Sequence, residues 1–565
     1  MKKSNAAINL SMTLLQRFRR FIKINVFGLK IIIVIQKGLK TYVNVISKLF
    51  RTFAYSAGSM TNSIKRLAGQ TAIYGVSTIA GRLLNYLLVP IYTNYFLTHE
   101  FGVISDMYAY VAILIVILTH GMETGFFRYS QQDPGKSNTI FSTSIVSVAV
   151  LALTFVFATI VFRFDIAALL RYPENPEYVL WLGIVIGLDA LMAIPYARLR
   201  AENRPLMFAF IKLTGIGVNI LLIIFFVVAA PWLIENSNPN IVNLVSRVYS
   251  PDIGIGYVFI ANLVASSITF MMLLPVIMRH RISFSAVIWK QMILYTLPLM
   301  LAGLAGIINE TLDKILLKYL LPEETALSQL GIYSAAYKIS VLMSLFIQAF
   351  RFAAEPFFFA EYKNENAQLL YARVMKVFVV TCLFIFLGIM LYMDIIQYFI
   401  GRDFREGLDV VPILLMAHIF LGIYFNLSIW YKLTGQTHFG AWIAVIGAFI
   451  TIIVNVWLIP VIGYYASAWA HLICYLIMTF ISWTWGKKHY PVPYDIGRIF
   501  LFIFTALAIY FMHSIIPDIT RIVNWVISAV LLIVFAFAVL AYDNEARETL
   551  KPLLKKLKRN KPPNQ

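Results

Sequence analysis

Long apolar runs separated by short polar segments dominate the chain from residue 70 to residue 542. A helix needs about 20 mostly apolar residues to cross the hydrocarbon core of a bilayer. Fourteen runs of about that length, each bounded by charge, Pro, Gly or Asn, are predicted to be transmembrane helices. They cover residues 70–92, 103–121, 140–162, 178–196, 207–230, 256–278, 292–309, 330–350, 374–398, 410–430, 441–460, 464–485, 499–516 and 522–542. The pattern predicts an all-α, polytopic membrane protein.

Composition excludes a soluble fold. Of the 565 residues, 60% are hydrophobic and 13% are charged, about half the charged fraction of roughly 25% in soluble proteins. The net charge of +20 indicates cytoplasmic loops and anionic membrane lipids as partners, and not nucleic acid. The two cysteines, Cys382 and Cys474, lie within apolar runs and are predicted to be packing residues.

Lys and Arg are distributed unevenly between the two sets of loops. With the amino terminus inside, sixteen of them fall in inner loops and eight in outer loops, in addition to two basic termini that are also inside. Basic side chains resist translocation and stay on the cytoplasmic side. We therefore predict that both termini are cytoplasmic.

The first 59 residues form a basic extension. Thirteen Lys and Arg precede Gly69, no acidic residue precedes Glu100, and the longest apolar stretch, 31–35, is too short to span a bilayer. One interpretation is an interfacial basic helix on anionic lipid. The other, which we favour, is that translation of the natural protein starts at Met60, which leads directly into the first span.

Two segments of the chain have the same order of helix, loop and motif. Aligned on Asn85 and Asn309, each has a spanning helix, a short outer loop and then Gly-x-x-Ser-x-x-Tyr, which starts at Gly102 in the first copy and Gly331 in the second. Six spans separate the copies, so both enter the membrane in the same direction. A parallel repeat of this kind is typical of two-bundle transporters.

The repeat divides the chain into five predicted parts. These are a basic extension (1–59), an amino-terminal six-helix bundle (60–285), a carboxy-terminal six-helix bundle (286–490), a helix pair (491–545) and a basic cytoplasmic tail (546–565).

Arg82 is the clearest ionisable residue at membrane depth. It lies about twelve residues into the first span, with Asn85 about one helical turn further on. A charge at this depth is costly unless it faces water or a partner, so it is a candidate functional residue. Arg82 either lines a water-filled cavity, which we favour, or forms a buried pair with Asp189 or Glu123.

A second group of polar residues begins at the end of the seventh span and comprises Asn309, Glu310, Asp313, Lys314 and Lys318. Helical spacing places Glu310, Asp313 and Lys314 on one broad face, where attraction between Glu310 and Lys314 offsets part of the cost of burial. That face is predicted to avoid lipid. Lys338 adds a cation near the same region, unless it extends toward the membrane surface.

Several motifs do not occur. The chain has no Gly-x-x-x-x-Gly-Lys-Ser/Thr loop for ATP, no His-Glu-x-x-His and no Cys-x-x-Cys. His418, His471 and His513 are isolated in separate spans and are expected to be packing residues. The longest outer loop, 231–255, has no paired carboxylates that would favour acid–base chemistry. We expect no enzyme activity, no metal site and no cofactor.

Three stretches carry a resemblance to a known family. They are Gly69-Gln-Thr-Ala-Ile-Tyr-Gly with Arg82 downstream; Asn309-Glu-Thr-Leu-Asp-Lys leading to Gly331-Ile-Tyr-Ser-Ala-Ala-Tyr-Lys; and Leu433-Thr-Gly-Gln-Thr followed by Asn455-Val-Trp-Leu-Ile-Pro-Val-Ile-Gly. In this order, and with fourteen spans, the chain after Met60 resembles the polysaccharide and O-antigen flippases of the multidrug/oligosaccharidyl-lipid/polysaccharide exporter superfamily.

The resemblance implies a monomeric carrier in the bacterial inner membrane. It would turn a polyisoprenyl-diphosphate-linked oligosaccharide from the inner to the outer leaflet by alternating access, for the synthesis of surface polysaccharide such as the O-antigen of lipopolysaccharide. In some relatives the last two helices line a groove for the lipid tail. Apart from the resemblance, the cations named above suit a diphosphate, because arginine binds phosphate through its planar guanidinium and lysine acts as a point charge.

Site residues follow from both arguments. The candidate substrate-binding residues are Arg82, Asn85, Asn309, Lys314, Tyr337 and Lys338, and the candidate ion-coupling residues are Glu310 and Asp313. Tyr86, Tyr92, Tyr108, Tyr333 and Tyr337 could stack on sugar rings.

The role of the two acids stays open at this point. Glu310 and Asp313 either bind a proton or sodium ion whose gradient drives the carrier, or serve as counter-ions for Lys314 and Lys338.

Three other functions of the protein also remain: a lipid II flippase, a multidrug antiporter of the same superfamily and, less favoured, a membrane-embedded glycan polymerase.

Overall fold

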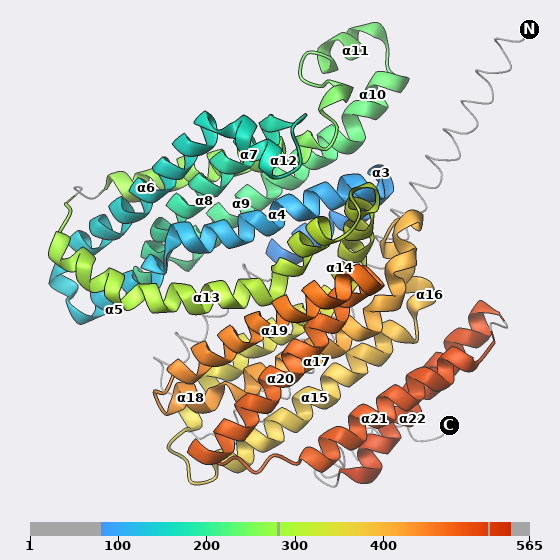
Figure 1. Ribbon diagram of the computed structural model, residues 1–565. Helices are drawn as coiled ribbons and strands as arrows, with labels where there is room; N and C mark the ends of the chain where they lie inside the picture. Colours follow the sequence, from blue (N-terminus) through green and yellow to red (C-terminus); the bar gives the residue numbers. More distant parts are fainter. Residues whose placement is uncertain (1–80, 280–282, 518–519, 544–565) are drawn as a thin grey trace, which may run out of the picture. The chain divides into compact units, whose positions relative to one another are not determined.

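The computed structural model describes residues 81–279, 283–517 and 520–543. Within these ranges the chain is helical without strands, and thirteen helical segments are long and apolar enough to cross a membrane (Figure 1). They correspond in order to the second through fourteenth predicted spans. The all-α polytopic fold is therefore confirmed. Only residues 81–92 of the first predicted span are described, and the basic extension and tail lie outside the described residues.

The helices follow one another along the chain with short connections. Their bounds are α3 (Val89–Tyr95), α4 (Thr98–Thr119), α5 (Met122–Gln132), η1 (Pro134–Lys136), α6 (Ser137–Val161), α7 (Arg163–Leu169), α8 (Pro176–Ala201), α9 (Pro205–Ile223), η2 (Ile224–Ala229), α10 (Ala230–Asn236), α11 (Pro239–Val245), η3 (Pro251–Ile253), α12 (Gly256–Met278), α13 (Ala286–Leu320), α14 (Glu323–Glu361), α15 (Ala367–Met390), α16 (Met393–Ile396), η4 (Gln397–Phe399), η5 (Arg402–Val410), α17 (Val411–Leu427), α18 (Ile429–Leu433), α19 (His438–Ile462), α20 (Tyr465–His489), α21 (Ile496–Ile515) and α22 (Arg521–Tyr542).

Local sequence explains where many of these helices begin and end. Pro176 and Pro205 open α8 and α9, because proline fits the first turn, where its missing N–H is not needed. The Ser285 hydroxyl accepts a hydrogen bond from the Ile288 N–H and caps α13. Gly463, with φ +60°, forms the tight turn between α19 and α20.

The predicted bounds of the seventh and eighth spans are wrong. Helix α13 has 35 residues and α14 has 39, whereas the apolar runs predicted 292–309 and 330–350. The apolar run of α13 stops at Asn309, but the helix continues to Leu320 because Asp313 and Lys318 are hydrogen-bonded to side chains of other helices. A satisfied polar residue need not end a helix.

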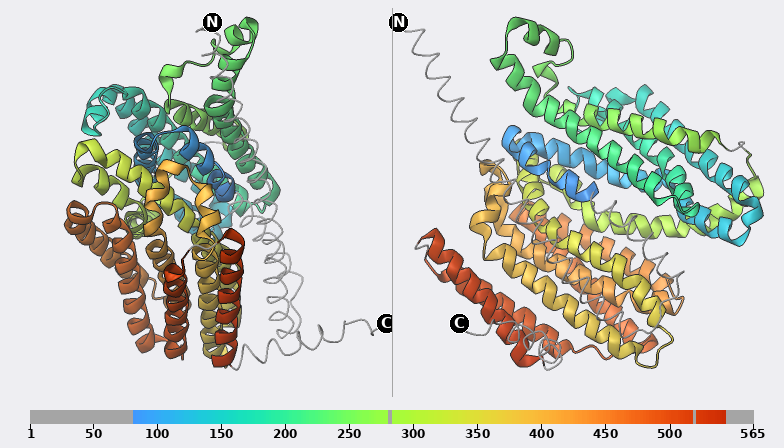
Figure 2. Two further views of the ribbon diagram at one scale, coloured as in Figure 1. Left: turned by 90° about the vertical axis from the view of Figure 1, so that its right-hand side faces the viewer. Right: turned by 180° about the vertical axis from the view of Figure 1, so that it is seen from behind.

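Contacts between helices define two groups and a separate helix pair. Helices α6, α8, α9 and α12 pack on one another, as do α14, α17, α19 and α20 with α13; α21 and α22 pack on α15 (Figures 1 and 2). Helix α13 contacts both α4 and α19. Division of the chain at residue 286 into two six-helix bundles stays a prediction.

The two glycines of the repeat meet where α4 crosses α14. A Cβ atom on Gly331 would lie 1.9 Å from the Thr98 carbonyl oxygen, and one on Gly102 would lie 1.9 Å from the Leu327 carbonyl oxygen. Only glycine permits so close an approach of two backbones. The Thr98 and Ser328 hydroxyl oxygens are 2.6 Å apart at the same crossing. We call the end of the helices that carries this crossing the outer end, after the predicted orientation.

Substitution of Gly331 by alanine is expected to prevent this close approach, because the added methyl group would overlap the Thr98 carbonyl. The distance between spin labels at the exposed positions Leu97 and Glu324 should increase. Gly388, near the C-terminal end of α15, has no atom within 4 Å of the place that a Cβ would occupy, so Gly388→Ala is the matched control and should leave the distance unchanged. An unchanged distance in Gly331→Ala would show that the crossing tolerates a side chain.

Candidate functional site

A buried ion pair joins α13 to α4 at the outer end. Lys318 Nζ lies 2.6 Å from Asp106 Oδ2, and the two side chains are 3% and 0% exposed. The Tyr172 hydroxyl donates a second hydrogen bond to the same oxygen at 2.8 Å, and its ring lies 3.7 Å from Lys318 Nζ. Burial and the Asp106 carboxylate raise the pKa of Tyr172, so its hydroxyl stays protonated and remains a donor.

Further contacts at the outer end connect the same helices. The Tyr110 hydroxyl donates to the Tyr319 hydroxyl at 3.2 Å, and Arg171 lies over the Tyr319 ring at 4.9 Å. The Lys318 ammonium also donates to the Leu170 carbonyl. Together with the glycine crossing, these contacts hold α4, α13 and α14 tightly packed at the outer end.

A second buried cluster lies among α13, α14 and α20. Asp313 Oδ2 accepts hydrogen bonds from the Tyr333 hydroxyl at 2.6 Å and from His471 Nε2 at 3.1 Å. Asp313 is 1% exposed and His471 is 2% exposed. We call Asp313, Lys314, Tyr333 and His471 the Asp313 cluster. The expectation that His471 is only a packing residue is wrong, because it is hydrogen-bonded to a carboxylate.

The neighbours of the Asp313 cluster include other predicted site residues. Lys314 Nζ lies 3.6 Å from Asp313 Oδ1 and 4.6 Å from the centre of the Tyr337 ring. The expected pairing of Lys314 with the Glu310 carboxylate is wrong, since Lys314 bonds instead to the Glu310 backbone carbonyl. Glu310 is exposed and Lys338 half-buried, and the charges of Lys314 and Glu310 both act on Lys338.

Asn309 lies apart from these charges, in a buried contact between α13 and α19. Its amide donates to the Ala444 carbonyl at 3.2 Å and its oxygen accepts from the Thr451 hydroxyl at 3.2 Å. Both ends of the side chain are therefore used within the protein in this conformation. A role for Asn309 in binding substrate stays a prediction.

A third cluster, on the α8 and α9 side, carries more positive than negative charge. Arg82 is exposed, and its charge, like those of Arg200 and Glu123, acts on Lys212 of α9. Arg200 Nη2 lies 2.6 Å from Glu123 Oε1. We call Arg82, Glu123, Arg200 and Lys212 the Arg82 cluster, which has three cations and one carboxylate.

Neither acid proposed as a buried partner of Arg82 pairs with it. Glu123 is paired with Arg200, and Asp189 accepts a hydrogen bond from the Ser266 hydroxyl at 2.9 Å. Within the described ranges Arg82 forms no ion pair. Asn85, about one helical turn further along the chain, is also exposed. The alternative of a buried structural pair with Asp189 or Glu123 is wrong.

The tyrosines proposed to contact sugar are engaged with other side chains. Tyr86 stacks on Phe399 at 4.3 Å, and the Tyr108 hydroxyl accepts a hydrogen bond from the Asn262 amide at 3.0 Å. The Tyr333 hydroxyl donates a hydrogen bond to the Asp313 carboxylate. Stacking of any of them on sugar stays a prediction.

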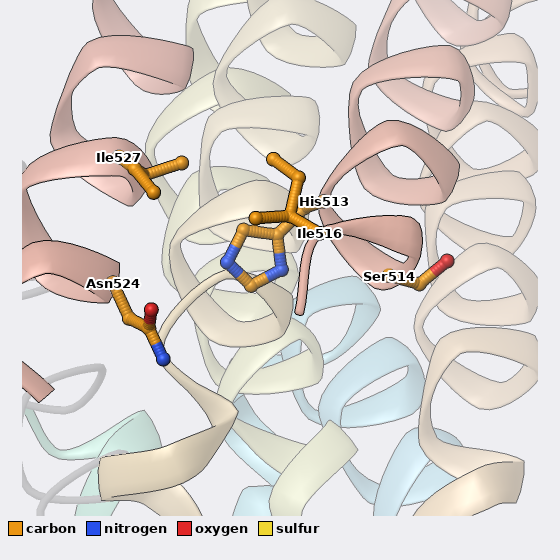
Figure 3. A pocket seen from close by; sticks show the side chains of 5 residues that line it. All are labelled: His513, Ser514, Ile516, Asn524 and Ile527. Atoms are coloured by element: carbon orange, nitrogen blue, oxygen red, sulfur yellow. The ribbon is translucent and has the colours of Figure 1, made fainter. Parts of the chain in front are cut away.

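A cavity lies between α21 and α22, away from the charged clusters in sequence. Its volume is about 240 Å³, and it is lined by His513, Ser514, Ile516, Asn524 and Ile527 (Figure 3). The His513 ring is held by a hydrogen bond of 3.2 Å between Nε2 and the Ser528 hydroxyl. The cavity contains none of the predicted site residues.

A family profile described as polysaccharide biosynthesis protein matches residues 67–360, more than half of the chain. The chain belongs to this polysaccharide biosynthesis family. No curated protein sequence matches it.

Solved structures show the same fold at low sequence identity. A lipid II flippase MurJ in an inward closed conformation is 16% identical, with a TM-score of 0.63 over 83% of this chain and 99% of that chain. An inward-facing multidrug resistance transporter of the MATE family and MOP superfamily is 14% identical, with a TM-score of 0.59 over 74% and 97%. A MOP superfamily transporter from Pyrococcus furiosus, described as having a binding pocket of reverse polarity, is 15% identical, with a TM-score of 0.53 over 76% and 98%. The resemblance inferred from the motifs is confirmed.

Sequence reasoning missed several residues of this polysaccharide biosynthesis family member. Asp106 lies within the second predicted span and Lys212 within the fifth, and a charge at that depth is the signal that should have marked both. Tyr172 lies in a short loop, where no pattern indicated a partner. His471 gave no sequence signal, because a histidine that contacts a distant carboxylate looks the same as one that packs.

Replacing Lys318 with methionine is expected to destabilise the packed outer end by about 3–5 kcal/mol, because the Asp106 carboxylate is left buried without a counter-charge. Adding Asp106→Leu should restore packing, since an apolar pair often replaces a buried ion pair at little cost. A membrane-impermeant thiol reagent at a cysteine introduced at Ser328 measures opening, because both natural cysteines are buried. Equal labelling of the single and double variants would contradict a closing role for the pair.

Proposed function

We propose that this protein flips a polyisoprenyl-diphosphate-linked oligosaccharide from the inner to the outer leaflet, for surface polysaccharide biosynthesis. Membership of the polysaccharide biosynthesis family supports the biosynthetic role. The fold shared with the lipid II flippase and the MATE transporters supports transport by alternating access, and not an enzyme reaction.

The observation that carries the proposal is the excess of cations in the Arg82 cluster. A diphosphate would cross bare hydrocarbon only at a cost of tens of kcal/mol on a Born estimate. Three cations against one carboxylate, with Arg82 exposed and not paired to a described acid, offer such a headgroup compensating charge. Lys314 and Lys338 add cations further along the chain, although Asp313 and Glu310 offset them locally.

The packed outer end supports a conformation in which substrate enters from the inner side. Buried contacts of α4 with α13 and α14 close the outer end, and the predicted orientation places the Arg82 cluster nearer the cytoplasm. The last two helices and their cavity then offer a location for the lipid tail. The remaining parts of the proposal are a bacterial inner membrane location, a monomeric state and binding of anionic lipids to the basic loops.

The rival functions make different demands on charge. A multidrug antiporter that takes up cationic drugs needs an acidic cavity, which the Arg82 cluster does not supply. A lipid II flippase needs the same cations and has the same fold as the MurJ structure, so it is the second candidate. Flipping assays in vesicles with lipid II and with an undecaprenyl-diphosphate oligosaccharide distinguish the two.

Arg82→Ala is expected to reduce flipping by about tenfold or more, since a charge-assisted hydrogen bond contributes about 1.5–3 kcal/mol. The amount of protein in the membrane should not change, because Arg82 is exposed and holds no described partner. Export of glycan to the cell surface and membrane protein levels measure the two effects.

Arg163→Ala is the matched control, because Arg163 lies in a predicted outer loop with its guanidinium over the neighbouring Phe164 ring at 4.7 Å. It should leave export unchanged. Full glycan display by Arg82→Ala would contradict a role for Arg82 in binding the headgroup.

A further inference from the structure

The Asp313 cluster has two buried polar atoms without hydrogen-bond partners in the described part of the chain. They are Asp313 Oδ1 and His471 Nδ1. Unpartnered polar atoms in a buried site are costly and rare in folded proteins. Lys314 Nζ, at 3.6 Å, compensates the charge at Asp313 Oδ1. The second nitrogen of the His471 ring has no such compensation.

The donors around Asp313 do not suit a metal ion. Tyr333 O–H, His471 N–H and the Lys314 ammonium all direct hydrogens toward the carboxylate. A hard cation needs several oxygen lone pairs around it, whereas here the positions near the carboxylate are taken by hydrogen-bond donors and an ammonium group. A proton needs only one lone pair, and His471 Nδ1 offers one.

We propose that His471 is a proton-binding site in which Asp313 positions the imidazole. In the deprotonated form, Nε2–H donates to Asp313 and Nδ1 carries a lone pair. A hydronium ion transfers its proton to that lone pair: one O–H bond breaks, one N–H bond forms, and the products are an imidazolium and a water molecule. The hydrogen bond to Asp313 then becomes charge-assisted, which strengthens it.

The charged and titratable groups around His471 come from four helices. They are Glu310, Asp313 and Lys314 on α13, Tyr333, Tyr337 and Lys338 on α14, His418 on α17, and Cys474 and Tyr475 on α20. Asp313 Oδ2 contacts the imidazole, and Lys314 Nζ lies 3.6 Å from Asp313 Oδ1. An imidazolium at His471 would therefore share the Asp313 carboxylate with the Lys314 ammonium.

The position of the cluster links the proton to the outer end. Asp313 and Lys318 lie on the same helix, five residues and about 7.5 Å of axial rise apart. One end of this stretch holds the His471 contact and the other holds the ion pair with Asp106. A change in charge at His471 therefore acts on the helix that closes the outer end. This rests on the proposed transport function and names the ion that drives it.

The first test needs no substrate. Purified full-length protein with ¹⁵N-labelled histidine is titrated by NMR over the range in which imidazole changes charge, in wild type, His471→Gln and His418→Gln. Glutamine at 471 keeps a donor toward Asp313 but cannot gain a proton. His418 is the matched control, because it is equally buried but its Nδ1 bonds to the Leu414 carbonyl of its own helix at 2.8 Å.

One pH-dependent histidine signal should disappear in His471→Gln and persist in His418→Gln. Loss of only pH-independent signals in His471→Gln would overturn the proposal. If His471→Gln fails to fold, the response of wild-type transport to pH and sodium gradients in the second test still tests the proposal.

The second test measures transport in vesicles that carry an undecaprenyl-diphosphate oligosaccharide. Wild-type flipping should change severalfold with a pH gradient and stay the same when sodium replaces potassium. His471→Gln should flip at a rate insensitive to the pH gradient, whereas His418→Gln should behave as wild type. A full pH response in His471→Gln, or a response to sodium in wild type, would overturn the proton site. Absence of flipping in wild type would instead contradict the proposed function, and the NMR titration would still decide the proton site.

Discussion

The buried pair of Lys318 and Asp106 shows the constraint on which this structure depends. The bilayer core has no water to hydrogen-bond a polar group, so each polar group at depth must find its partner inside the protein. Lys318 satisfies this with a carboxylate, a carbonyl oxygen and an aromatic ring, and so α13 extends beyond its apolar run. Because its carboxylate partner belongs to α4, the same interaction that allows the longer helix also ties distant parts of the chain together.

The polar clusters differ in how their charges are compensated. At the outer end, cation, carboxylate and phenol form a compact set that favours one packed arrangement. In the Asp313 cluster, one ring nitrogen is left without a described partner, and in the Arg82 cluster positive charge exceeds negative charge. The first arrangement suits closure, the second suits a mobile proton, and the third suits an anionic ligand. All three follow from how each cluster compensates its charges.

Helix α13 connects the two buried clusters. It contacts α4 on one side and α19 on the other, and it carries residues of both buried clusters. The glycine crossing of α4 and α14 adds a steric condition, because the backbones meet only where side chains are absent. In the transport cycle that we propose, movement of α13 couples the protonation of His471 to the packing of the outer end.

The sequence by itself determined the all-α class, the thirteen described spans and the resemblance to the flippase family, because hydrophobic length and ordered motifs are local properties. It also marked Arg82, Asp313, Lys314 and Lys338, since a charge within an apolar run or just beyond its end is visible without a structure. Only the tertiary structure decided which groups pair: Lys314 with Asp313 and not Glu310, Lys318 with Asp106, and His471 with Asp313. Lys314 and Asp313 are neighbours on α13, but the other two pairs join different helices more than a hundred residues apart. Such pairing depends on distances in space that no helical period encodes.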